Sequence, residues 1–283
     1  MSQYQTILYA ANGPVGTITL NRPETHNAQN MRMINEIDDA LNEACSDDSV
    51  RVIVLEGAGK SFSSGHDLSI ASADKDELDP YEDAYFQRRK TPETLFDHET
   101  EQYVNKCLAI RNAPKPTIAK VQGHCVAAGW MVASMCDLII AADSAKFANP
   151  VARMACVGAE IPVEFWDLGV RKAKELLFTG NKILADEAKT LGMVNQVVPL
   201  DELNAFTTAM ATQIAQVPPV TLKLIKQSMN RSLDAMGQAN SFSEHYVMHQ
   251  FGHQTQEFKD FMANRSDSSV KAFVNRRDKA ATQ

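Results

Sequence analysis

The amino-acid sequence predicts an α/β fold with a helical region at its C-terminus. Short runs rich in β-branched residues recur before about residue 200, and helical patterns lie between them. From Asp201 onward the pattern is helical almost to the end of the chain. We therefore divide the chain into a mixed core at residues 1–200 and a helical region at residues 201–283.

The first predicted elements are a hairpin, a helix and a buried strand. Two β-rich runs flank the turn signal NGPVG at residues 12–16. A helical pattern covers residues 31–45, and the apolar run RVIVLEG at residues 51–57 is typical of a buried strand. The Gly/Ser-rich loop AGKSFSSGHDL follows at residues 58–68, and the long acidic segment at residues 72–100 is typical of a lid.

The second half of the core has the same kinds of pattern. A helix predicted at about residues 100–112 leads into the strand TIAKVQG, and a second strand, DLIIAAD, follows the stretch GHCVAAGWMVASMC at residues 123–136. Two helical patterns end at Gly180 and Gly192, which are C-cap signals. The run MVNQVVP at residues 193–199 predicts a further strand.

The composition and length are those of a globular protein with one large domain, or with one domain and a small appendage. The 283 residues are 44% apolar and 22% charged, and a chain of this length buries roughly three quarters of its unfolded surface. The net charge of −7 argues against a nucleic-acid surface, and no run approaches the roughly 18 apolar residues of a membrane helix. Five cysteines without a CxxC pair, and no apparent signal peptide, indicate a reducing, cytoplasmic setting.

Two loops have the character of an active-site floor. Residues 61–68 and 121–130 each follow a predicted strand, are rich in small residues and lead into a predicted helix. Turns of this kind aim free backbone N–H groups at a ligand, and two that converged on one carbonyl would form an oxyanion hole. The alternative interpretation is two tight turns with no ligand.

The sequence resembles the enoyl-CoA hydratase/isomerase (crotonase) superfamily. The resemblance is carried by GTITLNRPETHNAQN at residues 16–30, GKSFSSGHDLS at residues 59–69, PKPTIAKVQGHCVAAGWMVASMCDLIIAADSAKFANP at residues 114–150 and FTGNKILADEAKTLGMVNQVVPLDEL at residues 178–203. The resemblance implies a spiral of ββα units with an acyl-CoA site. It also implies a C-terminal helical region that assembles homotrimers or dimers of trimers. Coenzyme A would enter as part of the substrate, with no separate cofactor and no metal.

The resemblance also implies a set of site residues. The backbone N–H groups of His66 and Ala128 would stabilise a thioester enolate, which leaves both side chains free to vary. The stretch His26, Asn27 and Ala28 would lie along the adenine and pantetheine of CoA. The other residues implied to bind substrate are Gly65, Gly129, Met131 and Val151. The candidate partners of the CoA phosphates are Arg22, Arg88, Arg89 and Lys90. The alternative interpretation of these four cations is that they are solvated surface charges.

Two positions depart from the hydratase pattern. Hydratases of the family keep one glutamate five residues before the Cys of MCD and another after the proline that follows AxF. Met131 and Val151 occupy these positions here, with no gap in the spacing between them. The acid or base must therefore come from elsewhere, and the two apolar side chains indicate a roomier acyl pocket.

Glu160 is the leading candidate for the missing carboxylate. Other members of the family place an acid within about one residue of this position, in a loop on the far wall of the pocket. Its apolar neighbours in the sequence would desolvate it and raise its pKa. Glu164 is the lesser candidate. The His66 imidazole either assists a proton transfer or only packs locally, and we expect His124 to be structural.

The run EHYVMHQFGH carries three histidines with a helical spacing. His245, His249 and His253 would share one face of a helix, as metal ligands can. No other feature of the sequence supports a metal, so we expect this face to pack on the core or a neighbour. One of these histidines, or Tyr246, would reach the acyl pocket.

Three functions remain open from the sequence. The preferred one is hydration of an enoyl-CoA with Glu160 replacing the usual pair of glutamates. The second is another reaction on the same enolate, either double-bond isomerisation or hydrolytic C–C cleavage of a β-keto or cyclic acyl-CoA. The third is a CoA-binding homologue without catalysis, and the fold alone does not choose among the three.

Overall fold

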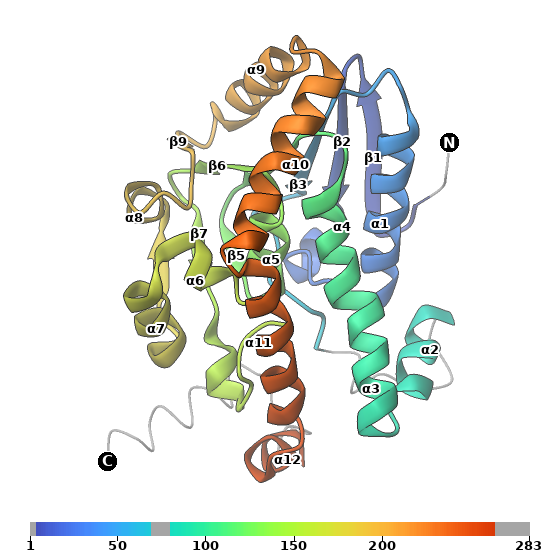
Figure 1. Ribbon diagram of the computed structural model, residues 1–283, viewed down its shortest axis with the longest axis vertical. Coiled ribbons are helices and arrows are strands. Elements are labelled where there is room, and N and C mark those ends of the chain that lie inside the picture. Colours follow the sequence, from blue (N-terminus) through green and yellow to red (C-terminus); the bar gives the residue numbers. More distant parts are fainter. Residues whose placement is uncertain (1–3, 69–79, 264–283) are drawn as a thin grey trace.

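A six-stranded sheet forms the centre of the computed structural model, which describes residues 4–68 and 80–263 (Figure 1). The hairpin predicted around residues 12–16 is present, because the first two strands pair antiparallel and all other neighbours in the sheet are parallel. In spatial order the strands are β1 (Ile7–Asn12), β2 (Val15–Leu20), β3 (Val52–Gly57), β4 (Thr117–Val121), β6 (Leu138–Ala142) and β9 (Gln196–Val198).

A smaller sheet lies beside the first. It contains β5 (His124–Val126), β7 (Lys146–Ala148) and β8 (Lys182–Leu184), with β5 and β7 parallel and β7 and β8 antiparallel. The loop after β3 joins this sheet through an isolated bridge between Ser63 and Cys125. The two loops that the sequence marks as an active-site floor are thus side by side.

Helices cover the sheet through apolar faces. α1 (Met31–Ser46) starts where the Asn30 side chain accepts a hydrogen bond from the Met33 N–H at 3.0 Å. α9 (Leu203–Ala215) packs on the strands β2, β3, β4 and β6. Trp130, in α5 (Ala128–Ser134), and Phe147 are fully buried, and each large apolar side chain of this kind stabilises the fold by about 1.5–3 kcal/mol.

The predicted lid is helical where the structure describes it. It contains α2 (Pro80–Arg88) and α3 (Pro92–Glu99), and Thr91 caps the second helix with a reciprocal capping box. The helix predicted at residues 100–112 is present in two parts, a π-helix at Thr100–Asn105 and then α4 (Lys106–Asn112). Residues 72–79 of the predicted lid lie outside the described residues.

The remaining elements run toward the C-terminus. They are η5 (Pro150–Met154), α6 (Val163–Leu168), α7 (Val170–Thr179), α8 (Ala185–Thr190), α10 (Pro219–Ala235), α11 (Gln238–Gly252) and α12 (Gln256–Ala263). The helices that end near Gly180 and Gly192 and those after residue 201 were predicted, whereas the first two elements were not. Gly180 ends α7 in the left-handed conformation, with a φ of 64°. None of the helices in the described ranges combines the length and apolar character that crossing a membrane requires. The boundary at residue 200 stays a prediction.

Candidate active site

The loop at residues 61–68 is held in place by backbone hydrogen bonds on both sides. On one side the Ser63 N–H donates to the His124 carbonyl at 3.1 Å, and the Val126 N–H donates to the Ser63 carbonyl at 2.9 Å. On the other side, the Gln29 N–H donates to the Gly65 carbonyl at 2.8 Å and the Asp67 N–H to the Gln29 carbonyl at 2.9 Å. The loop is therefore fixed between β5 and Gln29.

Within the described ranges, the backbone N–H groups of His66 and Ala128 have no backbone acceptor. The Gly65 carbonyl accepts a hydrogen bond from Gln29, and the N–H of the same trans peptide group points the opposite way, so the His66 N–H faces away from Gln29. Ala128 is the first residue of α5 and has no intrahelical acceptor for its N–H. Both residues line one cavity.

The turn before α5 has an unusual backbone. Ala127 has a φ of 48° and a ψ of −116°, although it is not a glycine. Such conformations cost of order 1–3 kcal/mol and cluster at functional sites. The turn is held by a hydrogen bond of 2.9 Å from the Ala127 N–H to the Ala148 carbonyl, so the small sheet maintains the strained turn that orients Ala128.

The two loops approach each other so closely that two positions require glycine. Gly65 has a φ of +92°, and a Cβ added there would lie 2.8 Å from the Val126 carbonyl oxygen and 3.3 Å from the Ala128 nitrogen. A Cβ on Gly129 would lie 2.6 Å from the Ser63 carbonyl oxygen. The sequence predicts these glycines as substrate-binding residues, and in the structure their observed role is to bring the two loops together.

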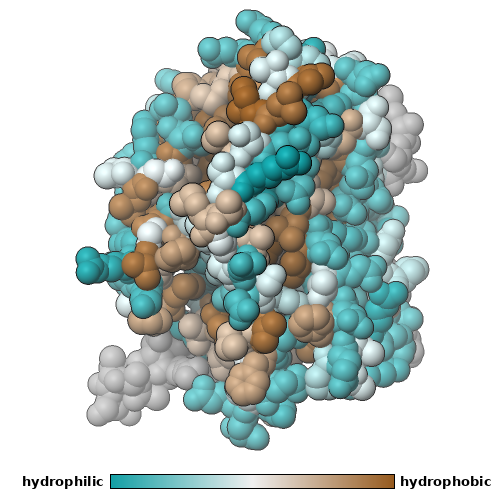
Figure 2. Space-filling model, in the orientation of Figure 1, coloured by the Kyte–Doolittle hydropathy of each residue, from teal (hydrophilic) through white to brown (hydrophobic). Residues whose placement is uncertain are grey.

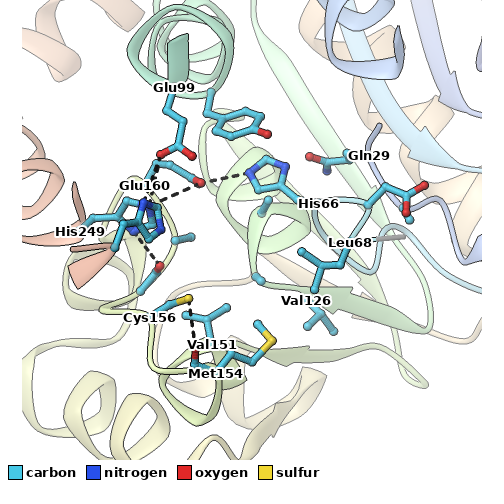
Figure 3. A pocket seen from close by; sticks show the side chains of 18 of the residues that line it. Gln29, His66, Leu68, Glu99, Val126, Val151, Met154, Cys156, Glu160 and His249 are labelled. Atoms are coloured by element: carbon cyan, nitrogen blue, oxygen red, sulfur yellow. Dashed lines mark hydrogen bonds and ion pairs between the residues drawn. The ribbon is translucent and has the colours of Figure 1, made fainter. Parts of the chain in front are cut away.

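The cavity has a volume of about 560 Å³. In Figure 3 apolar side chains, including Val126, Val151 and Met154, form one part of its wall. Ionisable groups gather at the other end, where Glu160 lies between His66 and His249. The site therefore combines an apolar compartment with one strongly polar end.

Glu160 and His66 form a partly buried contact between a carboxylate and an imidazole at this polar end. The Glu160 side chain is 6% exposed, and its Oε2 lies 3.2 Å from the Nε2 of His66. The imidazole also stacks on the Tyr103 ring, with 4.1 Å between the ring centroids and an angle of 27° between the planes. The sequence left open whether the His66 imidazole assists a proton transfer or only packs locally. In the structure it contacts Glu160 and packs on Tyr103, and a role in proton transfer stays a prediction.

The predicted direction of the Glu160 pKa is wrong. Burial does raise the pKa of this carboxyl, but the neighbouring imidazoles of His66 and His249 hold it well below its usual range. The sequence places apolar residues around Glu160 but does not reveal that two imidazoles face it. Glu160 is consequently held as a carboxylate by the imidazoles beside it, rather than as an isolated protonated acid.

The chain matches, over residues 10–283, the family model described as enoyl-CoA hydratase/isomerase. It belongs to this family. A crystal structure of a probable enoyl-CoA hydratase from Mycobacterium smegmatis is 42% identical, with a TM-score of 0.79, and the match covers 88% of this chain and 94% of that one. A crystal structure of an enoyl-CoA hydratase/isomerase from Xanthobacter autotrophicus Py2 is 28% identical, with a TM-score of 0.87. That match covers 98% of this chain and 99% of the other.

A sequence relative from Mycobacterium leprae, a probable enoyl-CoA hydratase named echA8, is 32% identical over 279 residues, which is 97% of each chain. The predicted resemblance to the enoyl-CoA hydratase/isomerase family is confirmed. The crotonase-like fold class with C-terminal helices is confirmed with it.

The two positions where hydratases of this family keep glutamates lie in different environments. Val151 lines the cavity. Met131 is 1% exposed and lies behind His66 and Tyr103, next to a void of about 20 Å³. Met131 is not among the described residues that line the main cavity, so the predicted enlargement of the acyl pocket can come from Val151 only.

Glu164, the lesser candidate for the acid, is occupied elsewhere. Its side chain is buried and accepts a hydrogen bond of 2.5 Å from the Asn149 amide. Burial raises the pKa of this carboxyl. Glu164 does not line the cavity in the described part of the chain, so of the two candidates only Glu160 is available to a ligand there.

The predicted CoA-binding stretch divides into three roles. The Ala28 side chain lines the cavity. The Asn27 side chain is buried and donates to the carbonyls of Ala58, Ser61 and Phe62 at 2.9–3.1 Å, so this side chain holds the loop instead of facing a ligand. His26 lies outside the cavity lining, with its Nδ1 3.1 Å from the Ser61 hydroxyl.

The candidate phosphate partners already face other groups of the protein. Arg22 lies 2.8 Å from Asp67, and Arg89 lies 2.8 Å from the buried Glu99. Arg88 forms an exposed pair with Glu101, and the Lys90 ammonium contacts Gln87. A phosphate-binding role for these four cations stays a prediction.

His124, which the sequence predicts to be structural, is exposed at the start of β5.

Sequence reasoning missed Glu99 and Tyr103 as members of the cavity wall. Both lie far from the recognised motifs, at the junction of α3 and the π-helix. His249 and His253 also line the cavity, as the sequence interpretation allowed for one of the three histidines. Tyr246 instead donates to the Phe96 carbonyl at 2.8 Å. No spacing pattern links residue 99 to residue 249.

Proposed function

We propose that this protein adds water to the double bond of an enoyl-CoA thioester. Members of the enoyl-CoA hydratase/isomerase family process acyl-CoA thioesters, and this chain is one of them. The observation that carries the proposal is the Glu160–His66 pair, 3.2 Å apart, in the wall of a cavity that Ala128 also lines. One ion pair there supplies both an acceptor and a donor of protons.

In the proposed reaction the thioester oxygen accepts hydrogen bonds from the His66 and Ala128 N–H groups. Water attacks the β-carbon, and its proton passes to Glu160. The electron pair of the double bond moves to the thioester as an enolate, which the two N–H groups stabilise. The His66 Nε2 then donates its proton to the α-carbon, which completes the addition of one water molecule.

The pair restores itself by one internal transfer. After the addition, the proton on Glu160 passes to the His66 Nε2 across the 3.2 Å between them. The low pKa of Glu160 depends on the charge of its imidazole partners. When His66 gives up its proton to the α-carbon, part of that charge is lost, so Glu160 keeps the proton it took from water until the addition is complete. A single pair can therefore do the work of two glutamates.

The test is turnover of crotonyl-CoA beside a β,γ-enoyl-CoA by the purified protein. We expect loss of the conjugated thioester and formation of a 3-hydroxyacyl-CoA. Faster conversion of the β,γ-substrate to the conjugated isomer would instead assign isomerisation to the same pair. Tight binding of CoA with no turnover of any acyl-CoA would contradict catalysis altogether.

We also propose a homotrimer or a dimer of trimers. Exposed apolar side chains on the C-terminal helices support it, and Figure 2 shows apolar surface over the face where α10 and α11 lie. They include Leu224, Ile225, Met229, Met236, Met248 and Phe251, all at least 53% exposed. Sedimentation of the purified protein should give a multiple of three chains, and a monomer or a dimer would contradict the proposal.

We propose a cytoplasmic location, because the five cysteines are free thiols and a reducing compartment keeps them so.

A further inference from the structure

Three ionisable side chains from distant parts of the chain meet at the polar end of the cavity. Glu99 ends α3, His249 lies in α11, and His253 directly follows that helix. Their side chains are 2%, 5% and 8% exposed. All three line the cavity beside Glu160, and Figure 3 shows Glu99 and His249 on the same side of it.

The nearest atoms of this cluster lie too far apart for hydrogen bonds. Glu99 Oε2 is 3.7 Å from His249 Nε2 and 3.8 Å from His253 Nδ1. Neither of these two buried nitrogens has a hydrogen-bond partner among the described residues. Because buried polar atoms without partners are rare, one carboxylate oxygen and two imidazole nitrogens facing each other point to a shared ligand.

The surrounding contacts orient two of the three groups, His249 and Glu99. The His249 Nδ1 lies 3.1 Å from the Gly158 carbonyl. Since only an N–H can donate to that carbonyl, the neutral imidazole carries its free electron pair on Nε2, toward Glu99. Arg89 holds the other oxygen of Glu99, Oε1, at 2.8 Å, and the Gln250 amide donates to Oε2 at 2.6 Å. A backbone carbonyl behind a histidine is the usual support of a metal-binding imidazole.

We propose that Glu99, His249 and His253 bind a divalent metal ion of the zinc type. Two imidazoles and one carboxylate are a zinc ligand set, whereas calcium and magnesium prefer oxygen ligands. In a tetrahedral site with bonds of about 2.0–2.1 Å the ligand atoms lie about 3.3–3.4 Å apart. The ligand atoms here are all within 4.8 Å of one another, and two of the three distances are 3.7 and 3.8 Å.

The site would have three protein ligands and would open on the cavity. Its fourth position would accept a water molecule or an oxygen of the bound acyl group. The metal would also lie close to Glu160, whose Oε1 is 3.9 Å from His249 Nε2. This inference goes beyond the proposed hydration, which does not use the metal, and it replaces the expectation from the sequence that the histidine face only packs.

A proton on His249 is the competing interpretation. Burial lowers the pKa of His249, but Glu99 and Glu160 raise it above its ordinary value overall, so an imidazolium would balance both carboxylates. That proton would leave the His253 Nδ1 without a partner, whereas a metal uses all three groups. The two interpretations therefore differ in what His253 contributes.

The test is a metal titration of the chelator-treated full chain, with Zn²⁺ alone and then with Co²⁺. We expect one equivalent to bind, and Co²⁺ to give the strong visible absorption of a four-coordinate site. Glu99→Gln and His253→Gln should each weaken binding at least tenfold. His245→Gln is the matched control, because His245 lies on the same helix and its Nε2 contacts the Ala159 carbonyl at 2.8 Å.

Two results would overturn the proposal. One is a wild-type protein that takes up neither ion, which would assign the cluster to a proton on His249. The other is binding that His253→Gln leaves unchanged, which would assign the metal to other residues. The folding of each variant is checked by its thermal unfolding curve. Since neither readout needs turnover, failure of the metal site would leave the hydration proposal standing.

Discussion

Replacing Glu160 by Gln is expected to lower kcat for enoyl-CoA hydration by about 10²–10⁴-fold, the usual contribution of a general acid or base. The amide has nearly the shape of the carboxylate and can still hydrogen-bond to His66, but it cannot accept a proton from water. It also removes the charge that pairs with the imidazole at 3.2 Å. The measurement is steady-state turnover of crotonyl-CoA by the variant and by the wild type.

Glu164→Gln is the matched control for this variant. It is the same change at a second buried glutamate, four residues further along, which bonds to Asn149 and lies outside the described cavity lining. We expect its kcat to stay within a few-fold of the wild type. Equal losses in the two variants would point to a general effect on folding. Undiminished turnover in Glu160→Gln would remove Glu160 from the mechanism.

Gly129→Ala is expected to lower kcat by about 10²–10³-fold, the loss that removal of one oxyanion donor causes. The new Cβ would lie 2.6 Å from the Ser63 carbonyl oxygen, so the two loops would have to separate. The adjacent Ala128 N–H would move with α5. Overpacking of this kind also lowers the free energy of unfolding by about 1–3 kcal/mol. Both effects are measured, by steady-state kinetics and by urea denaturation.

Gly16→Ala is the control for this variant. It shows whether a loss of activity comes from separating the two loops at Gly129 or from any replacement of a glycine by alanine. The atoms nearest to a Cβ on Gly16 would be side-chain atoms, the closest a Val50 methyl at 3.1 Å, and no residue of β2 lines the cavity in the described part of the chain. This control should retain the wild-type kcat. Should Gly129→Ala keep both full activity and full stability, the close approach of the two loops would not matter for catalysis.

The fold was largely predictable because its signals are local. The turn residues of the first hairpin, the apolar run of β3 and the glycine that ends α7 each depend on neighbours in the sequence, and the structure has all three elements. The positions of the missing glutamates were also readable, because motif spacing identifies Met131 and Val151. Spacing does not say that only Val151 would line the cavity.

The polar end of the site could be predicted only in part, because long-range contacts create it. Glu160 was selected as the acid from its place in the chain, but the direction of its pKa depends on His66, 94 residues away. The contact between Glu99 and Gln250 spans 151 residues. The helical spacing of His249 and His253 was visible in the sequence, whereas the carboxylate that faces them was not.

The central claim is that the Glu160–His66 pair replaces the two glutamates of a hydratase. A crystal structure with a non-reactive enoyl-CoA analogue tests it most directly. We predict the thioester oxygen about 2.7–3.1 Å from the backbone nitrogens of His66 and Ala128. We also predict the Glu160 carboxylate within about 4 Å of the α- or β-carbon, directly or through one water. An analogue bound in the cavity with no carboxylate at that distance would contradict the claim.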